Sequence, residues 1–301
     1  MLIKRLAAFL SVLSGLSFSA LAETVGKPVE KGIWLPEPAN QQAAEMFDFH
    51  WLLLIIITLI TIFVFLLLVW IALRYNAKRN PESATFTHNT LLEVVWTAVP
   101  VLILAAIAVP SIKLLYFQDV VPETEFAINV TGNQWNWTYN YPDHSGIEFT
   151  SVIVPNAAFE NNPEGSFDPN AKAQAEEEIT DHLGFAATLN ARLLDTNTRL
   201  VIPVNTAIKI NLTASDVIHS WTVPRFGVKL DAVPGRLNAT WVKVDKIGVF
   251  YGQCSELCGK DHAYMPIAVQ VVSKEDFAKW VEHAKGLYAE GPVKATTALG
   301  R

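Results

Sequence analysis

The chain has 301 residues, a formal net charge of −6 at pH 7 and a hydrophobic share of 51%, slightly above that of an ordinary soluble protein. This length allows one or two domains with a real core, and we expect no nucleic acid among the partners of so acidic a chain. The apolar excess is concentrated in three stretches, which argues against a purely soluble protein.

The first apolar stretch lies near the N-terminus. Lys4 and Arg5 precede an apolar run from 6 to 16, and small residues close it at Ala20 and Ala22. This order of charge, apolar core and small residues is typical of a cleaved secretory signal. We therefore predict a signal peptide over residues 1–22, with a short membrane anchor as the alternative, followed by an exported segment over residues 23–46.

The second stretch predicts a membrane-spanning helix. The run from Trp51 to Leu73 carries no charge and exceeds the roughly 20 residues that cross a bilayer. We expect this helix over residues 47–75, in direct contact with membrane lipid.

The third stretch predicts a second span over residues 91–117. It contains Pro100 and Pro110, which membrane helices tolerate where neighbouring groups satisfy the freed carbonyls, so we expect a kinked helix packed on a partner. A buried soluble helix is the alternative.

The loop between the two spans indicates their orientation. Residues 76–90, with the preceding Arg74, carry a cluster of positive charge that includes Lys78 and Arg79, and the positive-inside rule places this loop in the cytoplasm. The predicted signal independently places the N-terminus outside. The expected location is therefore a bacterial inner membrane, with both termini and the main domain on the periplasmic side.

Residues 118–290 form the predicted exported domain. Its segments rich in β-branched and aromatic residues, separated by Gly, Pro, Asn and Asp, indicate many short strands and hence a β-sandwich or barrel. The expected strands lie within 125–141, 147–155, 198–204, 207–215, 219–224, 239–245, 248–254 and 266–272.

Two further segments of this domain are not strands. The polar, acidic stretch near 156–190 reads as an inserted loop with one helical turn around residues 171–179. A helix follows the N-cap Ser273 and precedes a tail over residues 291–301; its apolar face is formed by Phe277, Trp280, Val281 and Ala284.

The segment "YGQCSELCGKDHAYMP" holds the two cysteines of the chain, Cys254 and Cys258. An exported domain makes a disulfide the default interpretation, and residues four apart can form one. Zinc is the second interpretation, although zinc sites do not use a ligand such as Met265. A thioether beside thiolate and imidazole is a soft ligand set that favours copper.

The spacing of these residues is close to that of a blue-copper loop, in which Cys, His and a weak axial Met follow one another and a second His comes from an earlier strand. Cys258, His262 and Met265 have this order, and His219 opens an earlier predicted strand. A blue-copper site lacks a second cysteine. Cys254 can supply a second thiolate, and two thiolates can bridge a pair of copper ions.

With these ligands, the sequence resembles subunit II of the haem–copper cytochrome c oxidases, in particular the bacterial aa3-type members. The resemblance covers most of the chain after the signal, apart from the insert and the termini. The segments that carry it are "LLEVVWTAVP" (91–100), "GNQWNWTYNY" (132–141), "DVIHSWTVP" (216–224), "KLDAVPGRLN" (229–238) and "YGQCSELCGKDHAYMPI" (251–267).

The resemblance implies a membrane-anchored all-β protein: two N-terminal transmembrane helices, arranged as a hairpin, followed by a cupredoxin-like Greek-key β-sandwich that holds the binuclear copper centre CuA. It implies bridging thiolates from Cys254 and Cys258 and terminal imidazoles from His219 and His262. Met265 and the carbonyl of Glu256 are the implied weak ligands. The side chain of Glu256 is the implied ligand of a magnesium ion shared with subunit I.

The resemblance also implies roles outside the copper site. Trp135 is the expected point where electrons arrive from cytochrome c, whereas Trp137 is expected in the core. Glu93 is the expected entrance of a proton pathway. The implied docking acids for cytochrome c are Asp143, Glu148, Asp195 and Asp216, and the implied contacts with subunit I are Asp231 and Arg236.

The function implied is that of an oxidase subunit: cytochrome c reduces CuA, which passes electrons to haem in subunit I for the reduction of oxygen to water, with proton pumping. Subunit III is an expected further partner. The alternatives are a membrane-tethered cupredoxin carrier or copper-delivery protein, a quinol oxidase subunit lacking copper ligands, and a structural domain with a disulfide.

Overall fold

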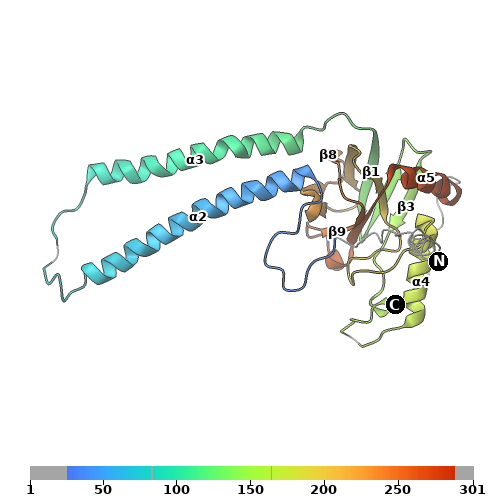
Figure 1. Ribbon diagram of the computed structural model, residues 1–301, viewed down its shortest axis with the longest axis horizontal. Coiled ribbons are helices and arrows are strands. Elements are labelled where there is room, and N and C mark those ends of the chain that lie inside the picture. The colour runs from blue at the N-terminus through green and yellow to red at the C-terminus, as the bar shows by residue number, and fades with distance from the viewer. Residues whose placement is uncertain (1–25, 83, 164, 289–301) are drawn as a thin grey trace, which may run out of the picture.

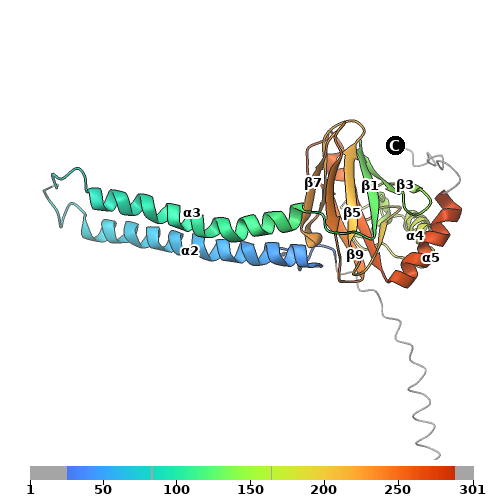
Figure 2. The same ribbon diagram turned by 90° about the horizontal axis from the view of Figure 1, so that it is seen from above.

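Two long helices form a hairpin that leaves one end of a two-sheet domain (Figures 1 and 2). The computed structural model describes residues 26–82, 84–163 and 165–288, so the predicted signal over 1–22 and the predicted tail over 291–301 lie outside the described residues. Helix α2 spans Gln41–Arg74 and helix α3 spans Thr90–Asp119.

Both helices are long and apolar enough to cross a membrane. Helix α2 begins several residues before the predicted start at 47 because its first turn is held by the sheet domain. The side chain of Asn40 caps the helix by accepting from Ala43 N, and Gln42 Nε2 donates to Trp241 O at 3.1 Å. Helix α3 continues through Pro100 and Pro110.

The domain consists of two five-stranded sheets. The first has the order β3-β2-β1-β5-β8 and the second the order β4-β10-β9-β6-β7; β1 with β5 and β4 with β10 are the parallel pairs. The strands of the first sheet are β1 (Phe126–Asn133), β2 (Asn136–Tyr141), β3 (Ile147–Ser151), β5 (Ile208–Ala214) and β8 (Asn238–Val242). Those of the second are β4 (Leu200–Pro203), β6 (His219–Val223), β7 (Val228–Ala232), β9 (Gly248–Cys254) and β10 (Pro266–Val272).

The burial pattern explains this packing. Strand β1 alternates between buried and half-buried positions, as expected when one face of a sheet covers the core, whereas β10 is buried along its whole length. The predicted β-sandwich is confirmed. Strand β7 was not among the expected strands. It is a short edge strand paired only with β6, and buried and exposed residues do not alternate regularly along it.

The insert contains a full helix, α4 (Pro169–Leu183), so the prediction of one helical turn was wrong. Asp168 caps the helix, Pro169 occupies its first turn, and Gly184 ends it at φ 72°. Its acidic exposed side hides a buried stripe formed by Ala175, Ile179, His182 and Leu183.

Helix α5 (Lys274–Tyr288) packs beside α4, on the side of the sandwich opposite the hairpin (Figure 2). The predicted cap is present, since Ser273 Oγ accepts from Asp276 N at 3.0 Å. The predicted apolar face is also confirmed, because Phe277, Trp280, Val281 and Ala284 are all buried.

His182 joins α4 to the rest of the domain and is 2% exposed. Its Nε2–H donates to Arg199 O at 2.7 Å, and its Nδ1 accepts from the hydroxyl of Tyr288 at 2.8 Å. Burial lowers the pKa of His182 to about 4, since the neutral ring fits this environment and the charged ring does not.

This histidine should make the domain sensitive to acid. The folded-state pKa lies below the unfolded value of about 6.5, so the unfolded chain binds more protons between these values, and stability falls as pH drops from about 6.5 to about 4, by up to about 3 kcal/mol. We expect His182→Gln to flatten this dependence in urea unfolding of a fragment from residue 118 onward. Lys279→Gln, on the exposed side of α5, is the control. An unchanged profile in His182→Gln would contradict the assignment.

Candidate metal centre

The pairing of three interior strands brings distant residues together at one end of the second sheet. Strand β9 is antiparallel to both β6 and β10. The end of β9 therefore lies beside the beginnings of its two neighbours. Cys254 ends β9, His219 begins β6 and Met265 immediately precedes β10, so these side chains meet although they come from separate segments.

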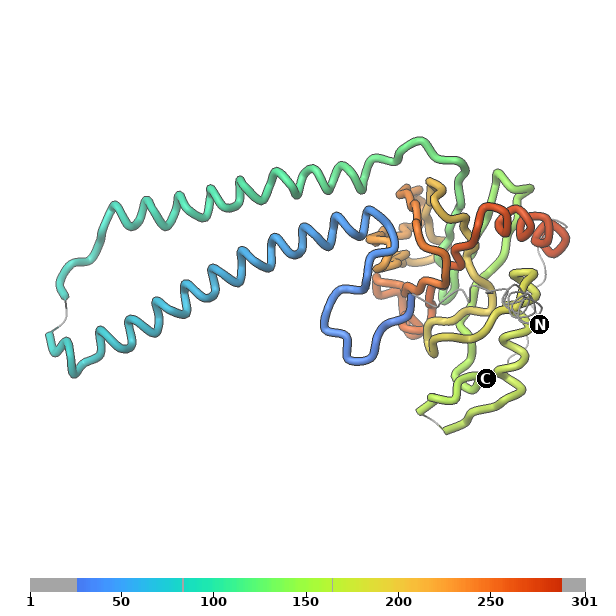
Figure 3. Tube along the Cα trace, viewed as in Figure 1, coloured from blue at the N-terminus to red at the C-terminus, as the bar shows by residue number. Residues whose placement is uncertain are grey.

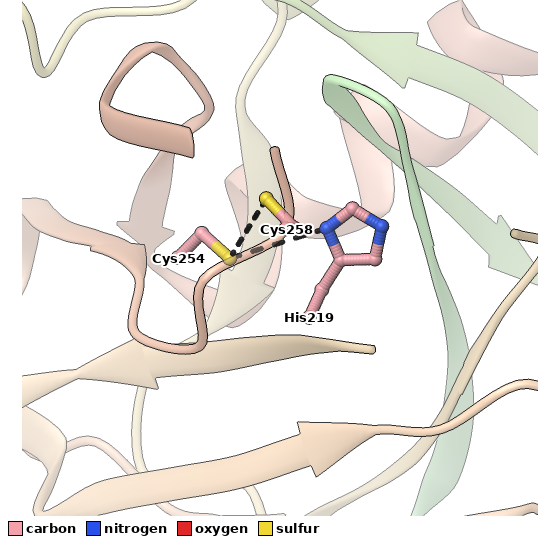
Figure 4. A group of neighbouring side chains, drawn as sticks. All are labelled: His219, Cys254 and Cys258. Atoms are coloured by element: carbon pink, nitrogen blue, oxygen red, sulfur yellow. Dashed lines mark hydrogen bonds between the residues drawn. The ribbon is translucent and has the colours of Figure 1, made fainter. Parts of the chain in front are cut away.

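The two cysteines are free and buried, with 3.8 Å between their Sγ atoms (Figure 4). The structure therefore does not contain the disulfide that was the default interpretation. The Nδ1 atom of His219 lies 4.0 Å from Cys254 Sγ and 3.3 Å from Met265 Sδ. Sulfur and nitrogen donors from three strands thus converge on one small volume.

The loop after β9 supplies the remaining donors. Cys258 Sγ lies 3.5 Å from His262 Nδ1 and 3.5 Å from Met265 Sδ. The carbonyl of Glu256 accepts from Cys254 Sγ at 3.3 Å, whereas the Glu256 residue itself is exposed. The short helix η3 (His262–Tyr264) folds this loop back over the sulfurs. All six predicted donors are close together.

Asp216 fixes the orientation of His219. Its Oδ1 atom accepts from His219 Nε2 at 2.9 Å, and the imidazole is fully buried. With its proton on Nε2, the ring directs the lone pair of Nδ1 towards the sulfurs, which is the usual arrangement for a histidine that binds a metal. The same carboxylate accepts from Gln134 N at 2.7 Å through Oδ2, so it is held from two sides.

The site is apolar around its donors. Cys254, Cys258 and Met265 are all nearly inaccessible, and the edge of the Trp137 ring faces His219 at 5.9 Å between centroids. Burial and the neighbouring Cys254 thiol raise the pKa of Cys258 well above its usual range. Both cysteines lose their protons when a cation binds, because the thiolate is the form that ligates metals.

This donor set fits copper. Two thiols, two imidazoles and a thioether are soft to intermediate ligands, which select copper over magnesium, calcium or manganese. The thioether of Met265 argues against structural zinc.

Trp135 lies beside the site without entering it. Its Nε1 donates to Cys258 O at 3.2 Å, and the side chain of Gln134 donates to the same carbonyl at 2.8 Å. The ring is half-buried and carries the ammonium of Lys260 over its face at 5.6 Å. By contrast, Trp137 is fully buried, as expected of a core residue.

The predicted docking acids differ in exposure. Asp143 and Glu148 are exposed around the β2–β3 turn, at the opposite end of β2 from Trp135. The prediction of Asp195 as a docking acid was wrong, because this residue is 0% exposed and cannot be a surface acid. It forms a salt bridge with Arg199 Nη2 at 3.0 Å and accepts from the hydroxyl of Tyr251 at 2.9 Å, so it stabilises the interior.

Asp216 remains partly exposed, but sequence reasoning missed that it positions His219. The spacing of three residues between Asp216 and His219, across the loop that enters β6, was the available signal. The sequence predicted a docking role for Asp216 because of its charge. The structure adds its hydrogen bond to His219.

The other predicted residues lie away from the six donors. Glu93 is in the first turn of α3, at the end of the hairpin far from the sheets (Figure 1). Asp231 is exposed on β7, where its register partner Ser220 adjoins His219. Arg236 is exposed in the loop from β7 to β8.

The fold and site together define a membrane-anchored cupredoxin-type protein with a soft His–Cys–Cys site. Comparison with protein families identifies it further. Residues 28–114 match the transmembrane domain of cytochrome c oxidase subunit II, and residues 126–169 and 179–272 match its periplasmic domain. The chain belongs to the cytochrome c oxidase subunit II family.

Individual members of this family are similar in sequence to the chain. A Rickettsia bellii protein named "Probable cytochrome c oxidase subunit 2" is 46% identical over 84% of this chain and 84% of its own length. Cytochrome c oxidase subunit 2 of Cereibacter sphaeroides is 43% identical over 88% of this chain and 84% of its own. The crystal structure of the periplasmic domain of subunit II of cytochrome oxidase from Bradyrhizobium japonicum is 43% identical, with a TM-score of 0.45 over 56% of this chain and all of that one.

The role of Asp216 can be tested by metal affinity. We expect Asp216→Ala to weaken copper(I) binding about 10–100-fold, since loss of the partner frees the imidazole to adopt other orientations and tautomers. Asp216→Asn, which keeps an acceptor, should lose less. Competition with a chromophoric copper(I) chelator measures this, with Glu148→Gln as the control at an exposed acid. Equal affinities for Asp216→Ala and the native chain would show that the hydrogen bond is unimportant.

Proposed function

We propose that this chain is the subunit through which electrons enter a proton-pumping cytochrome c oxidase, with a binuclear CuA centre that accepts them from cytochrome c and passes them to haem in subunit I. The observation that carries the proposal is the convergence of four further donors on the two cysteine sulfurs, which lie 3.8 Å apart. Family membership supports the oxidase rather than the alternative of a free carrier or copper-delivery protein.

In this proposal Cys254 and Cys258 would hold the copper pair through their thiolates. His219 and His262 would bind through Nδ1, the atoms that face the sulfurs, and Met265 and the carbonyl of Glu256 would be the weak ligands. When bound, the copper pair supplies one-electron transfer with little change in bond length. The protein contributes burial, which excludes water, and a fixed His219, whose orientation is set by Asp216 before any metal arrives.

Trp135 is proposed as the point where electrons arrive. The support is its position: a half-buried ring at the surface whose Nε1 hydrogen-bonds to the backbone of a proposed copper ligand, Cys258. The path from the ring to that ligand therefore consists of one hydrogen bond and a few covalent bonds.

Docking of a basic cytochrome c is proposed to use the exposed acids Asp143 and Glu148, together with the exposed side of Asp216. Strand β2, whose six residues separate Trp135 from Asp143, is about 20 Å long at roughly 3.3 Å per residue. At that distance a carboxylate acts by steering the partner rather than by a direct contact at the site of electron transfer.

Further proposals concern subunit I and subunit III, which would complete the complex. The carboxylate of Glu256 is proposed to bind magnesium at the contact with subunit I, with Asp231 and Arg236 nearby, and their exposure supports this. Glu93 is proposed to open a proton pathway, supported by its place at the membrane boundary of α3. The sheet domain is proposed to lie in the bacterial periplasm.

Copper loading tests the central proposal. We expect the purified chain, reconstituted with copper, to show the absorption and electron-resonance spectrum of one unpaired electron shared by a copper pair. Cys258→Ser should abolish that spectrum because one bridge is lost, whereas Ser255→Ala, between the cysteines, should leave it intact. A native chain that takes up a single copper ion, or none, would overturn the binuclear assignment.

Steering can be tested through salt dependence. In the oxidase complex, we expect neutralising Asp143 and Glu148 together to lower kcat/KM for cytochrome c at low ionic strength and to reduce its dependence on salt, because exposed charges act on association and are screened by ions. Glu177→Gln on α4 is the matched control. An unchanged salt dependence in the double variant would remove these acids from the docking surface.

A further inference from the structure

The N-terminal segment before α2 forms a strap across the edge of the sandwich nearest the hairpin. In Figures 1 and 3 it is the dark blue loop between the sheets and the start of α2. The strap, residues 27–38, is fixed at its first end by the bridge between Gly26 and Phe250. A Cβ at Gly26 would lie 2.2 Å from Val249 O, so this close crossing requires glycine.

The second end of the strap is fixed by the sheet domain as well. Ala39 N donates to Arg225 O at 2.9 Å, and Asp245 N donates to Ala39 O at 3.1 Å. The side chain of Asn40 donates to Phe226 O at 3.0 Å. With both ends held, the strap encloses a cleft of about 550 Å³ against β6, β9 and the short helix η2 (Pro224–Phe226).

One wall of the cleft is polar and cationic. Arg225 is 8% exposed, and its Nε is buried without a hydrogen-bond partner among the described residues; the same holds for Thr222 Oγ1 beside it. Lys27 also lines the cleft. The acid that lines the cleft, Glu37, forms a salt bridge with Lys246 at 2.7 Å. The charge of Glu37 is therefore neutralised by Lys246, and the lining of the cleft stays positive through Arg225 and Lys27.

A buried guanidinium without a hydrogen-bonded anion is costly. Burial lowers the pKa of Arg225, and the charge of Glu37 partly opposes this effect. Phosphate, like carboxylate, is an anion that a guanidinium binds well, because its planar donors match two phosphate oxygens. The polar wall is therefore suited to a phosphate group.

The opposite wall is apolar and leads to the membrane. Ile33, Trp34 and Leu35 line the cleft, and Ile33 is 89% exposed and Trp34 57% exposed. The Trp34 ring packs on Trp51, the first residue of the uncharged run of α2, with 4.9 Å between centroids. Tryptophan at such a boundary is typical of the headgroup layer of a bilayer. The cleft is thus continuous with the membrane-spanning surface.

We propose that this cleft binds an anionic phospholipid of the leaflet nearest the sheet domain, with its phosphate on Arg225 and its acyl chains along Ile33 and Trp34 towards α2. The two walls match the two halves of such a lipid. None of the six predicted copper ligands lines the cleft, although Gln253 and Ser255, the neighbours of Cys254, do, and the proposal does not depend on copper.

Native mass spectrometry of the full chain in detergent tests this site with defined lipids. We expect phosphatidylglycerol to be retained in preference to phosphatidylcholine. Arg225→Gln should lower phosphatidylglycerol retention about tenfold, to the level of phosphatidylcholine, since a charge-assisted bidentate contact is lost. Arg225→Lys should retain an intermediate amount, and Lys285→Gln on the far helix α5 should behave like the native chain.

A second readout separates lipid binding from folding. Phosphatidylglycerol with brominated acyl chains should quench tryptophan fluorescence in the native chain, and Trp34→Phe should reduce this quenching while leaving the unfolding temperature unchanged. Equal retention of the two lipids by the native chain would overturn the proposal. So would an Arg225→Gln chain that retains phosphatidylglycerol normally but no longer co-purifies with a haem-bearing subunit, because a protein segment would then be the occupant.

Discussion

The metal centre depends on the register of β9 between β6 and β10. Because β9 is antiparallel to both, its last residue, Cys254, lies beside Trp221 of β6, two residues from His219, and close to the residue that precedes β10. A slip of one residue would turn Cys254 to the opposite face of the sheet and separate it from the imidazole. The core beneath these strands, buried along the whole of β10, holds this register.

A second layer of hydrogen bonds joins the site to the surface. Asp216 accepts from both His219 Nε2 and Gln134 N, and Cys258 O accepts from both Gln134 and Trp135. The turn between β1 and β2 is therefore tied to a histidine on one side and to a cysteine on the other. Such a network limits movement of the donors, which suits the proposed role in electron transfer without rearrangement.

The membrane end of the domain is organised by different contacts. The start of α2 and the strap before it are bonded to η2 and to the end of β8 through Asn40, Gln42 and Ala39. Gly227 accommodates this approach, since a Cβ there would lie 2.9 Å from the backbone of Ala43, and its φ of 65° also favours glycine. The sheet domain is thus fixed directly to the first membrane helix and is not suspended on a free linker.

Several features followed from the sequence because they are local. The uncharged run from Trp51 to Leu73 specifies a long apolar helix, Ser273 specifies the start of α5, and the loop from Cys254 to Met265 carries its own set of soft donors. Other local signals misled. The many acidic residues of α4 suggested a loop although one side of this helix is buried, and buried and exposed residues do not alternate regularly along the edge strand β7.

The rest was decided by tertiary structure, because it depends on residues brought together over long separations. Asp195 has the sequence character of a surface acid, yet the pairing of its carboxylate with Arg199 and Tyr251 buries it completely. Asp216 positions His219 through a hydrogen bond, a role that its charge alone could not predict. The sequence by itself determined which ligands this protein offers, since ligand chemistry belongs to residue type; the pairing of β6 with β9, which joins His219 to a cysteine 35 residues away, decided that they form one site.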